Sequence, residues 1–349
     1  MKKIRPQFVF SNSAEHPNKE NTIEKDMATD ESSNKRVLIT VDEKDRGGPE
    51  KLKVTLGEIP VPSNSQVLIQ VKACGVNFID VYHRTGLYPG ITEIGKEGAG
   101  VILAVGKQVE QFKVGQNTKE LMVIPEPLLK THKEKGYIYA AAIPLQGLTA
   151  HYLCRSVYDV GPNDTVLVHA GAGGTGGLLI QICKKILKCK CVITTVGSDD
   201  KAKVALQSGA DYVINYEKED FYEKVNLFTK GKGCNVVYDG VGKATWEKSL
   251  KCVSPLGRVV YFGNSSGKIP PIDPLELTKQ GSVTLVRPNL AHFIATPEAL
   301  QARAKELFEW IESQQLQIRI GAAIPLKNAA KAHQLIESRD TTGKIVLIP

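Results

Sequence analysis

The sequence predicts an α/β protein with two domains: a doubly wound parallel sheet in the middle of the chain, and a smaller β-rich domain. Three observations lead to this prediction. The length of 349 residues suits about two domains. From residue 165 onward, short apolar runs alternate with helical patterns. Before residue 144, short β-branched segments are separated by Gly, Pro and Asn instead.

The first segment, residues 1–35, is polar and poor in aromatic residues, so we expect it to be disordered. It carries six acidic residues between positions 15 and 31, which a mitochondrial transit peptide normally lacks. Its apolar stretch IRPQFVF is too short for a secretory signal. We therefore expect a tail without a targeting function.

The β-rich region extends from Arg36 to about Pro144. Its segments RVLITV, KLKVTLGEI and SQVLIQVKACGV are short and β-branched, and prolines 60 and 62 separate the second from the third. This pattern predicts an antiparallel, barrel-like arrangement.

Six continuous apolar segments follow, as expected of parallel strands that are buried on both faces. These segments are TVLVHA (165–170), CVITTV (191–196), DYVI (211–214), NVVYDG (235–240), RVVYFG (258–263) and SVTLV (282–286). Helical stretches such as GLLIQICKKILK and DDKAKVALQSG lie between most of them, which predicts βαβ units. The last part of the chain breaks this rhythm: it holds a long helix starting at Thr296-Pro297, a second helix and a final strand. We expect it to fold back onto the first domain.

A glycine-rich turn separates the first of these strands from the helix after it. Gly171, Gly173 and Gly176 form a G-x-G-x-x-G pattern in HAGAGGTGG. Glycines allow a tight turn and let the backbone approach a pyrophosphate, which then lies at the positive end of the helix dipole. In this strand–turn–helix context the pattern predicts a dinucleotide site.

The residues that follow the second strand indicate whether the protein binds NADP or NAD. Gly197 and Ser198 form the turn, and Lys201 follows one helical turn later, which suits a dianionic 2′-phosphate. Asp199 and Asp200 argue mildly against this, although acidic residues are ordinary at a helix start. We expect NADPH to be preferred over NADH.

Charge, hydropathy and cysteine content argue against several other classes of protein. The net charge is +8, but the basic residues are interspersed with acidic ones, so we expect no nucleic-acid partner. No apolar run approaches the roughly 20 residues that cross a bilayer. The seven cysteines, an odd number, suggest reduced thiols and a cytoplasmic protein. Cys189 and Cys191 have no further partners spaced as in a zinc site.

Nine blocks of sequence carry a resemblance to a known family. They are GVNFIDVYHRTGLYP (75–89), GKEGAG (95–100), AAAIPLQGLTAHYL (140–153), HAGAGGTGG (169–177), GADYVINY (209–216), VVYDGVGKATWEKSL (236–250), VVYFGNSSG (259–267), TLVRP (284–288) and ESRDTTGKIVLIP (337–349). From about Arg36 to Pro349 the chain resembles the zinc-independent medium-chain dehydrogenases/reductases, and within them the quinone oxidoreductases that include zeta-crystallin.

The resemblance implies a fold, a set of domains and an assembly. A GroES-like catalytic domain would comprise residues 36–146 and 288–349, and a Rossmann NADP-binding domain residues 147–287. Similar enzymes are homodimers or homotetramers that pair through the last strand of the Rossmann sheet, here near SVTLV. They transfer hydride from NADPH to a quinone or an α,β-unsaturated carbonyl.

The resemblance also implies site residues. Asn77, Tyr82 and Tyr88 would be the catalytic hydrogen-bonding groups at the substrate. The cofactor-binding residues would be Phe78, Asp80, Thr149, Tyr152, Gly173, Gly174, Thr175, Gly176, Ser198, Lys201, Tyr216, Gly240, Phe262, Gly263, Asn264, Arg287 and Arg339. Of these, Asp80 and Tyr82 also fit purely structural roles, and Tyr216 fits a core position.

We expect no metal ion. Zinc-dependent relatives have a cysteine and a histidine where this chain has Asn77 and Lys96, and Glu97 alone cannot build a catalytic zinc site. Without a Lewis acid, alcohol oxidation is difficult. Hydride addition to an electron-poor quinone or enone requires only a hydrogen-bond donor at the oxygen.

One stretch departs from the family pattern. The segment VGQNTKELMVIPEPLL, which begins at Val114, is about ten residues short of what relatives have there. A real deletion, a faulty gene model and a reorganised loop all remain open as explanations. Besides quinone reduction, two further interpretations therefore remain: an alkenal or enone reductase, and a weakly active NADPH-binding protein of structural or RNA-binding use.

Overall fold

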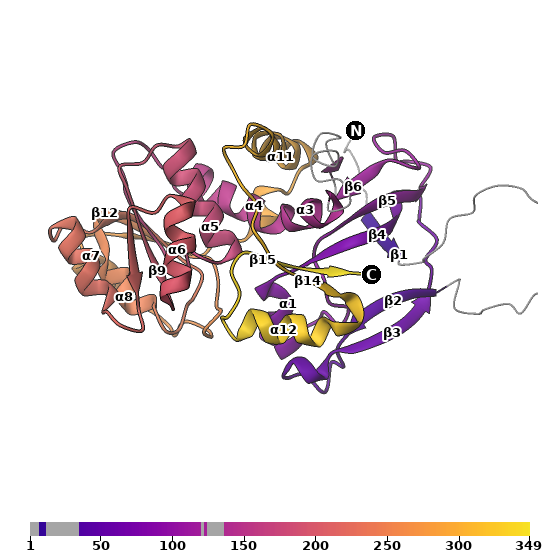
Figure 1. The fold of residues 1–349 in the computed structure, drawn as a ribbon, viewed down its shortest axis with the longest axis horizontal. Coiled ribbons are helices and arrows are strands. Elements are labelled where there is room, and N and C mark those ends of the chain that lie inside the picture. Colours follow the sequence, from indigo (N-terminus) through magenta and orange to yellow (C-terminus); the bar gives the residue numbers. More distant parts are fainter. Residues whose placement is uncertain (1–6, 12–34, 120–121, 124–135) are drawn as a thin grey trace, which may run out of the picture. The chain divides into compact units, whose positions relative to one another are not determined.

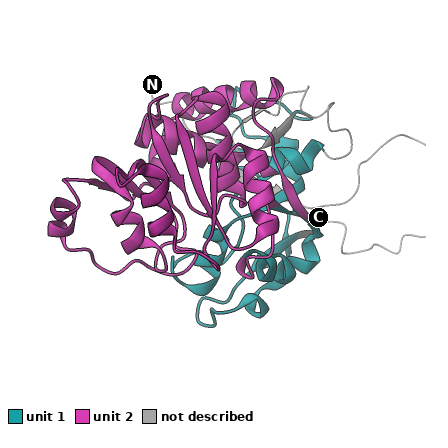
Figure 2. Cartoon of the chain, turned by 60° about the vertical axis from the view of Figure 1, so that its left-hand side comes forward, with its two compact units in different colours: residues 1–141, 323–336, 345–349 teal, residues 142–322, 337–344 magenta. Residues whose placement is uncertain are grey.

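The computed structural model describes residues 7–11, 35–119, 122–123 and 136–349. It divides into two compact units (Figure 2). Unit 1 comprises residues 1–141, 323–336 and 345–349, and unit 2 comprises residues 142–322 and 337–344. The predicted short segment after Gly115 lies mostly outside the described residues.

Unit 1 is built on a largely antiparallel sheet with the strand order β14-β15-β4-β5-β6-β7, and β1 pairs with β4 in addition. Its strands are β1 (Gln7–Ser11), β4 (Gln66–Val76), β5 (Gly98–Val105), β6 (Asn117–Lys119), β7 (Met122–Val123), β14 (Ile320–Pro325) and β15 (Lys344–Ile348). Val67, Ile69, Ile102 and Phe112 form one core cluster between its strands. The final strand β15 pairs antiparallel with β4, so the end of the chain does return to the first unit, as predicted.

Strand β1 corrects the prediction of disorder for part of residues 1–35. Residues 7–11 lie parallel to residues 66–70 of β4. The sequence QFVFS there has three consecutive aromatic or β-branched residues, and an edge of β4 supplies backbone hydrogen-bond partners.

The other elements of unit 1 are short. β2 (Lys35–Thr40) and β3 (Lys53–Glu58) form a separate antiparallel pair. The helices are α1 (Phe78–Thr85), α3 (Gly136–Ala142), α12 (Ala329–Glu337) and the 3₁₀ turns Pro49–Lys51 and Leu326–Asn328. Helix α1 follows β4 directly, and this junction carries the predicted catalytic residues.

Unit 2 contains a six-stranded sheet in which every pair of neighbours is parallel. Its strand order is β10-β9-β8-β11-β12-β13. The strands are β8 (Thr165–Val168), β9 (Cys191–Val196), β10 (Tyr212–Asn215), β11 (Cys234–Asp239), β12 (Val253–Tyr261) and β13 (Thr284–Val286). This is the 3-2-1-4-5-6 order of a Rossmann sheet. The first three strands are added toward one edge of the sheet and the last three toward the other, so the strand order reverses between β8 and β11.

The helices of unit 2 either connect consecutive strands of this sheet or precede and follow it in the chain (Figure 1). They are α4 (Pro144–Tyr152), α5 (Gly174–Gln181), α6 (Asp199–Ser208), α7 (Phe221–Thr229), α8 (Trp246–Lys251), α9 (Pro274–Lys279), α10 (Leu290–Phe293) and α11 (Pro297–Glu312). The π-helical turns Leu153–Val157 and Ile182–Ile186 extend α4 and α5. Apolar residues from strands and helices form a continuous core, with Leu167, Ile193, Val237 and Val259 fully buried.

The compact units differ from the predicted domain ranges in the C-terminal part. Residues 288–322 and 337–344 belong to unit 2 by their contacts, although the sequence assigns them to the catalytic domain. Helix α11 packs on α4, which accounts for its place in unit 2. The assignment of functional domains stays a prediction.

Candidate functional site

The glycine-rich turn lies at the carboxyl end of β8, next to the point where the strand order reverses. Its backbone is tied to the neighbouring strands: Gly171 donates to the carbonyl of Thr195 at 3.1 Å, and His169 donates to that of Tyr238 at 3.0 Å. Gly173 is the N-cap of α5 and donates back to Ala170 at 2.9 Å. The turn therefore has one fixed path between strand and helix.

Two of the glycines are required by close packing. A Cβ atom on Gly176 would lie 2.9 Å from the carbonyl carbon of Ala170, and one on Gly171 would lie 2.8 Å from Cδ1 of Ile180. At Gly177 the nearest atom would be 3.5 Å away, an ordinary contact. The pattern G-x-G-x-x-G thus reflects helix–strand packing at its first and last positions.

The first turn of α5 presents backbone donors. Gly174, Thr175 and Gly176 occupy its first three positions, where N–H groups have no intrahelical acceptor. These donors and the helix dipole together attract an anion. The side chain of Gln146 lies against Gly174 at the start of the helix. The turn can hold the diphosphate of a dinucleotide without any cationic side chain.

A buried carboxylate supports the backbone at the end of β11. Asp239 is fully buried and accepts four hydrogen bonds. Oδ1 accepts from the backbone N–H groups of Val241 (2.8 Å) and Gly242 (3.0 Å), and Oδ2 from the hydroxyls of Thr245 (2.6 Å) and Ser249 (2.7 Å). These four bonds hold the Asp239 side chain in one position, so Asp239 fixes the loop that follows β11.

His169 links this carboxylate to the neighbouring strand. Its Nε2 lies 2.9 Å from Oγ of Ser249, and its Nδ1 lies 2.8 Å from Oγ1 of Thr195. Since Ser249 uses its proton toward Asp239, Nε2 donates to Ser249 and Nδ1 accepts from Thr195. Burial lowers the pKa of His169, which the charge of Asp239 partly opposes, so the ring stays neutral. The network joins β9, β11 and α8 to His169, which follows β8 at the start of the glycine-rich turn.

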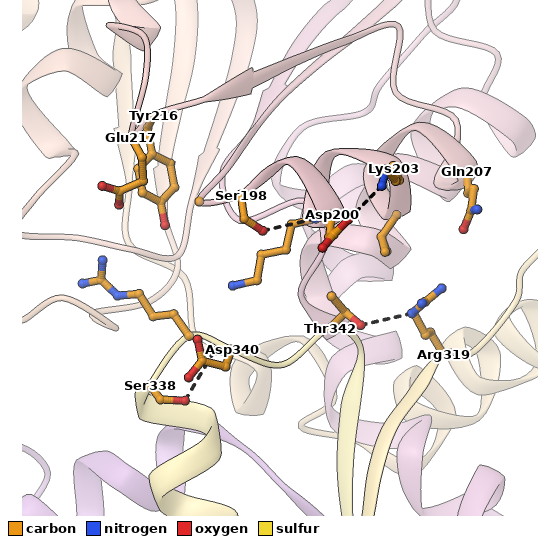
Figure 3. A pocket seen from close by; sticks show the side chains of 14 residues that line it. Ser198, Asp200, Lys203, Gln207, Tyr216, Glu217, Arg319, Ser338, Asp340 and Thr342 are labelled. Atoms are coloured by element: carbon orange, nitrogen blue, oxygen red, sulfur yellow. Dashed lines mark hydrogen bonds and ion pairs between the residues drawn. The ribbon is translucent and has the colours of Figure 1, made fainter.

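A cavity of about 600 Å³ lies at the carboxyl ends of β9 and β10 in unit 2 (Figure 3). Its lining comes from the start of α6, the end of β10 and the C-terminal segment. The lining residues are Gly197, Ser198, Asp200, Lys201, Lys203, Val204, Gln207, Tyr216, Glu217, Arg319, Ser338, Arg339, Asp340 and Thr342.

The cavity brings together four of the predicted cofactor residues: Ser198, Lys201, Tyr216 and Arg339. Burial lowers the pKa of Lys201; Asp340 acts to raise it and Arg339 to lower it further. Among the described residues, no carboxylate oxygen lies within 4.0 Å of the Lys201 ammonium. An unpaired, partly desolvated cation is an effective partner for a phosphate dianion.

Ser198 and Tyr216 shape the same cavity. Ser198 caps α6 by accepting from the backbone N–H of Lys201 at 3.3 Å. The Tyr216 ring lies against Gly197, where a Cβ would come within 3.0 Å of Cζ. Tyr216 is 38% exposed, so it is a surface aromatic here and not the core residue that the sequence also allowed.

The remaining predicted cofactor residues of unit 2 lie around the carboxyl ends of β11 and β12 and in α4. Gly240 and Gly263 approach closely, since a Cβ on Gly263 would lie 2.9 Å from Cα of Gly240. Tyr152 stacks on Phe293 with ring centroids 4.4 Å apart. Arg287 donates to the carbonyl of Tyr261 at 2.9 Å. Thr149 lies in α4, and Phe262 and Asn264 follow β12. Their contacts with a cofactor stay predictions.

In unit 1, the junction of β4 and α1 holds the predicted residue Asn77. Its amide nitrogen donates to Glu97 Oε1 at 2.7 Å, and its backbone N–H donates to Asp80 Oδ2 at 2.8 Å, forming a capping box. Asn77 and Asp80 are both 2% exposed. These bonds give Asn77, Asp80 and Glu97 a structural role at the start of α1, and the catalytic role of Asn77 stays a prediction.

The two predicted tyrosines are in contact. Tyr82 and Tyr88 meet edge to face with centroids 5.1 Å apart, and Phe78 lies 6.1 Å from Tyr82. Tyr88 is anchored through its backbone, which donates to the carbonyl of Tyr82 (3.0 Å) and accepts from His83 Nδ1 (3.0 Å). Tyr82 is buried and Tyr88 is half-buried, so Tyr88 is the more accessible of the two phenols.

Within the described ranges, no group of three His, Cys, Asp or Glu side chains could hold a metal ion, and the absence of a metal stays a prediction. No helix there is long and apolar enough to span a bilayer.

Sequence reasoning missed three residues. His169 and Asp239 act through partners up to 80 positions away, so no local pattern announces them. Arg319 lines the cavity because its backbone carbonyl accepts from Lys344 and its Nε donates to Thr342 Oγ1 at 3.2 Å. For His169 and Asp239, the only signal in the sequence is that each is a polar residue directly after an apolar strand, in VHA and YDG.

Two family models match the chain. The Alcohol dehydrogenase GroES-like domain matches residues 63–162, and the Zinc-binding dehydrogenase family matches residues 208–347. The crystal structure of Escherichia coli quinone oxidoreductase complexed with NADPH has a similar fold, with a TM-score of 0.84 and 36% identity. The match covers 90% of this chain and 100% of that one.

Two relatives are similar to this chain over most of its length. Quinone oxidoreductase of Pseudomonas aeruginosa is 42% identical over 318 residues, covering 87% of this chain and 97% of the relative. The 2-haloacrylate reductase of Burkholderia sp is 35% identical over 324 residues, with the same coverage. The predicted GroES-like and Rossmann folds are therefore confirmed, and the chain belongs to the quinone oxidoreductase family of zinc-independent medium-chain dehydrogenases/reductases.

Proposed function

We propose that this protein is an enzyme that reduces quinones with NADPH by hydride transfer. One observation carries the proposal: a glycine-rich turn at the end of β8 and a cationic cavity at the end of β9 occur in one Rossmann sheet. The turn suits the diphosphate, and Lys201 and Arg339 suit the 2′-phosphate that distinguishes NADPH from NADH. The relative in Escherichia coli, whose structure holds NADPH, supports the same cofactor.

We assign the chain's own residues as follows. The N–H groups of α5's first turn bind the diphosphate, while Asp239 and His169 hold the adjacent backbone in place. Ser198, Lys201, Tyr216 and Arg339 bind the adenosine ribose and its 2′-phosphate. The remaining predicted residues, namely Phe78, Asp80, Thr149, Tyr152, Gly240, Phe262, Gly263, Asn264 and Arg287, line the rest of the cofactor path.

For the chemistry, NADPH when bound supplies the hydride. Tyr88, Tyr82 and Asn77 are the proposed hydrogen-bonding groups at the acceptor oxygen. Of these, the Tyr88 phenol suits the role best, because it is half-buried and its backbone is fixed on both sides. A donor held at the developing negative charge lowers the barrier without reorganising during the reaction.

A second candidate is the reduction of a conjugated carbon–carbon double bond in an enone or alkenal. The similarity to a 2-haloacrylate reductase supports it. Both reactions add hydride to an electron-poor carbon, so they would share one cofactor site.

We further propose a homodimer that pairs through β13, with a homotetramer as the alternative. β13 ends the six-stranded sheet, and an unpaired edge strand is a template for a second copy. Nearby, Leu256 is 82% exposed and Leu275 is 62% exposed. We place the protein in the cytoplasm, because all seven cysteines are free thiols.

The test is NADPH oxidation measured with 9,10-phenanthrenequinone and with an alkenal. Faster turnover of the quinone supports the main proposal, and faster turnover of the alkenal favours the second candidate. Tight NADPH binding without activity on either acceptor would contradict both and would indicate a binding protein.

A further inference from the structure

Three carboxylates line the cationic cavity: Asp200, Glu217 and Asp340. Asp200 is neutralised by an ion pair with Lys203 at 2.8 Å. Asp340 differs, because no cationic nitrogen of the described residues lies within 4.0 Å of its carboxylate. It therefore contributes a full negative charge to a cavity that we assign to a phosphate dianion.

The backbone of the C-terminal segment fixes Asp340 in this place. Gly343 donates to the carbonyl of Ala172 in the glycine-rich turn at 3.0 Å. Asp340 itself donates through its backbone to Ser338 Oγ at 3.4 Å. Figure 3 shows Asp340 and Thr342 on the wall of the cavity opposite Ser198 and Tyr216. These backbone bonds hold the segment beside the glycine-rich turn, and Asp340 lines the cavity.

The negative charge of Asp340 interacts electrostatically with the Lys201 ammonium. It acts to raise the pKa of the Lys201 ammonium, whereas Arg339 acts to lower it. The two opposite charges thus lie close enough to interact, although they form no direct ion pair. Whatever anion binds Lys201 would also be repelled by Asp340.

We propose that Asp340 is a specificity-determining residue that limits the preference of this cavity for NADPH over NADH. Its carboxylate opposes the 2′-phosphate of NADPH, and it leaves the uncharged 2′-hydroxyl of NADH unaffected. This inference rests on the proposed function, since it assumes that the adenosine end of the cofactor lies in the cavity.

The size of the effect follows from Coulomb's law. A dianionic phosphate about 8 Å from a carboxylate, at an effective dielectric constant of about 60, is repelled enough to change affinity roughly tenfold. Salt reduces this repulsion, because the Debye length at physiological ionic strength is about 8 Å. We therefore expect a three- to tenfold effect, as an order of magnitude, at low salt.

The experiment uses Asp340→Asn in the full chain and measures dissociation constants by isothermal titration calorimetry. The probes are NADPH, NADH and two fragments, adenosine 2′,5′-bisphosphate and adenosine 5′-monophosphate. Asp159→Asn is the matched control, because it removes the same charge from an exposed position of unit 2 that does not line the cavity.

We expect Asp340→Asn to bind NADPH and the bisphosphate about three- to tenfold more tightly at low salt, and to bind NADH and the monophosphate within about twofold of wild type. The gain should shrink as salt is raised, and Asp159→Asn should show neither change. Unchanged or weaker bisphosphate binding by Asp340→Asn would overturn the inference alone. If wild type binds the two fragments equally, the assignment of the cavity to the 2′-phosphate fails as well.

Discussion

The two proposed phosphate-binding regions of unit 2 use opposite means. The turn at the end of β8 offers backbone N–H groups and no cationic side chain, and it rests on the buried network of Asp239 and His169. The cavity at the end of β9 is lined by the cationic side chains of Lys201 and Arg339. One region is fixed by packing, whereas the other depends on charge.

This difference explains what each region can contribute. A diphosphate occurs in both NADH and NADPH, so recognising it requires only a fixed geometry. The 2′-phosphate distinguishes the two cofactors, and side chains that carry charge can recognise it. Substitutions in the turn should therefore remove binding of both cofactors, and substitutions in the cavity should change selectivity.

The largest effect is expected at Gly176. In Gly176→Val the side chain would collide with the Ala170 carbonyl group, because even a Cβ would lie 2.9 Å from its carbon. We expect the affinity for both cofactors to fall by more than about 100-fold, as for a lost set of charge-assisted bonds. Titration of intrinsic fluorescence with NADPH and NADH measures this. Gly177→Ala is the matched control and should stay within about twofold, since its Cβ has 3.5 Å of space. Equal losses in the two variants would show that the turn does not bind by close approach.

Lys201→Met tests the charged region. Loss of one charge-assisted bond of about 2 kcal/mol corresponds to about 20- to 30-fold weaker NADPH binding, while NADH binding should hardly change. The ratio of kcat/KM for the two cofactors measures it. The control is Lys203→Met, because Lys203 lines the same cavity but is already paired with Asp200. A similar loss of kcat/KM with NADH would contradict the proposal that this cavity recognises only the 2′-phosphate.

A third kind of polar region, the tyrosine pair of unit 1, should give a smaller effect. Tyr88→Phe removes one proposed donor at the acceptor oxygen and keeps the ring contact with Tyr82. Turnover with a quinone should fall about five- to tenfold, and NADPH affinity should stay the same. Single-turnover kinetics separate the two. Complete loss of turnover with normal NADPH binding would mean that the phenol does more than donate one hydrogen bond.

The smallest expected effect is on stability, through the buried network. Burial lowers the pKa of His169, so below pH 6.5 the unfolded chain binds a proton that the folded chain does not. The free energy of unfolding should then fall as pH decreases, by about 1.4 kcal/mol per pH unit for this group. In unit 1, burial and Arg84 lower the pKa of His333 to about 3, with the same sign.

Thermal unfolding between pH 8 and pH 5.5 measures this dependence. His169→Gln should be less stable at pH 8 and should lose less of its stability on acidification than wild type. Parallel curves for the two proteins would contradict a neutral, buried His169.

Much of the fold could be predicted because its signals are local. Each strand of the parallel sheet is a continuous apolar run, and the glycines between β8 and α5 indicate a close turn. Strand β1 was missed because QFVFS is isolated in a polar segment, and only its pairing with β4 makes it a strand. The π-helical turns after α4 and α5 were missed because they follow from packing, and composition gives no signal for them.

The candidate site was predictable to a similar degree. Lys201 and Ser198 stand next to a strand end, so their place follows from the βαβ rhythm. Arg319 and Asp340 reach the cavity because the chain returns to it near the C-terminus, and the sequence does not show which side chains of that return face inward. The network of Asp239 and His169 depends on distant partners in the same way.

The most direct test of the account is a crystal structure of this protein with NADPH at a resolution that shows both phosphate groups. We predict the diphosphate within hydrogen-bonding distance of the backbone N–H groups of Thr175 and Gly176, and the 2′-phosphate at the Lys201 ammonium. A diphosphate held by cationic side chains away from α5, or a 2′-phosphate outside the cavity at the end of β9, would contradict it.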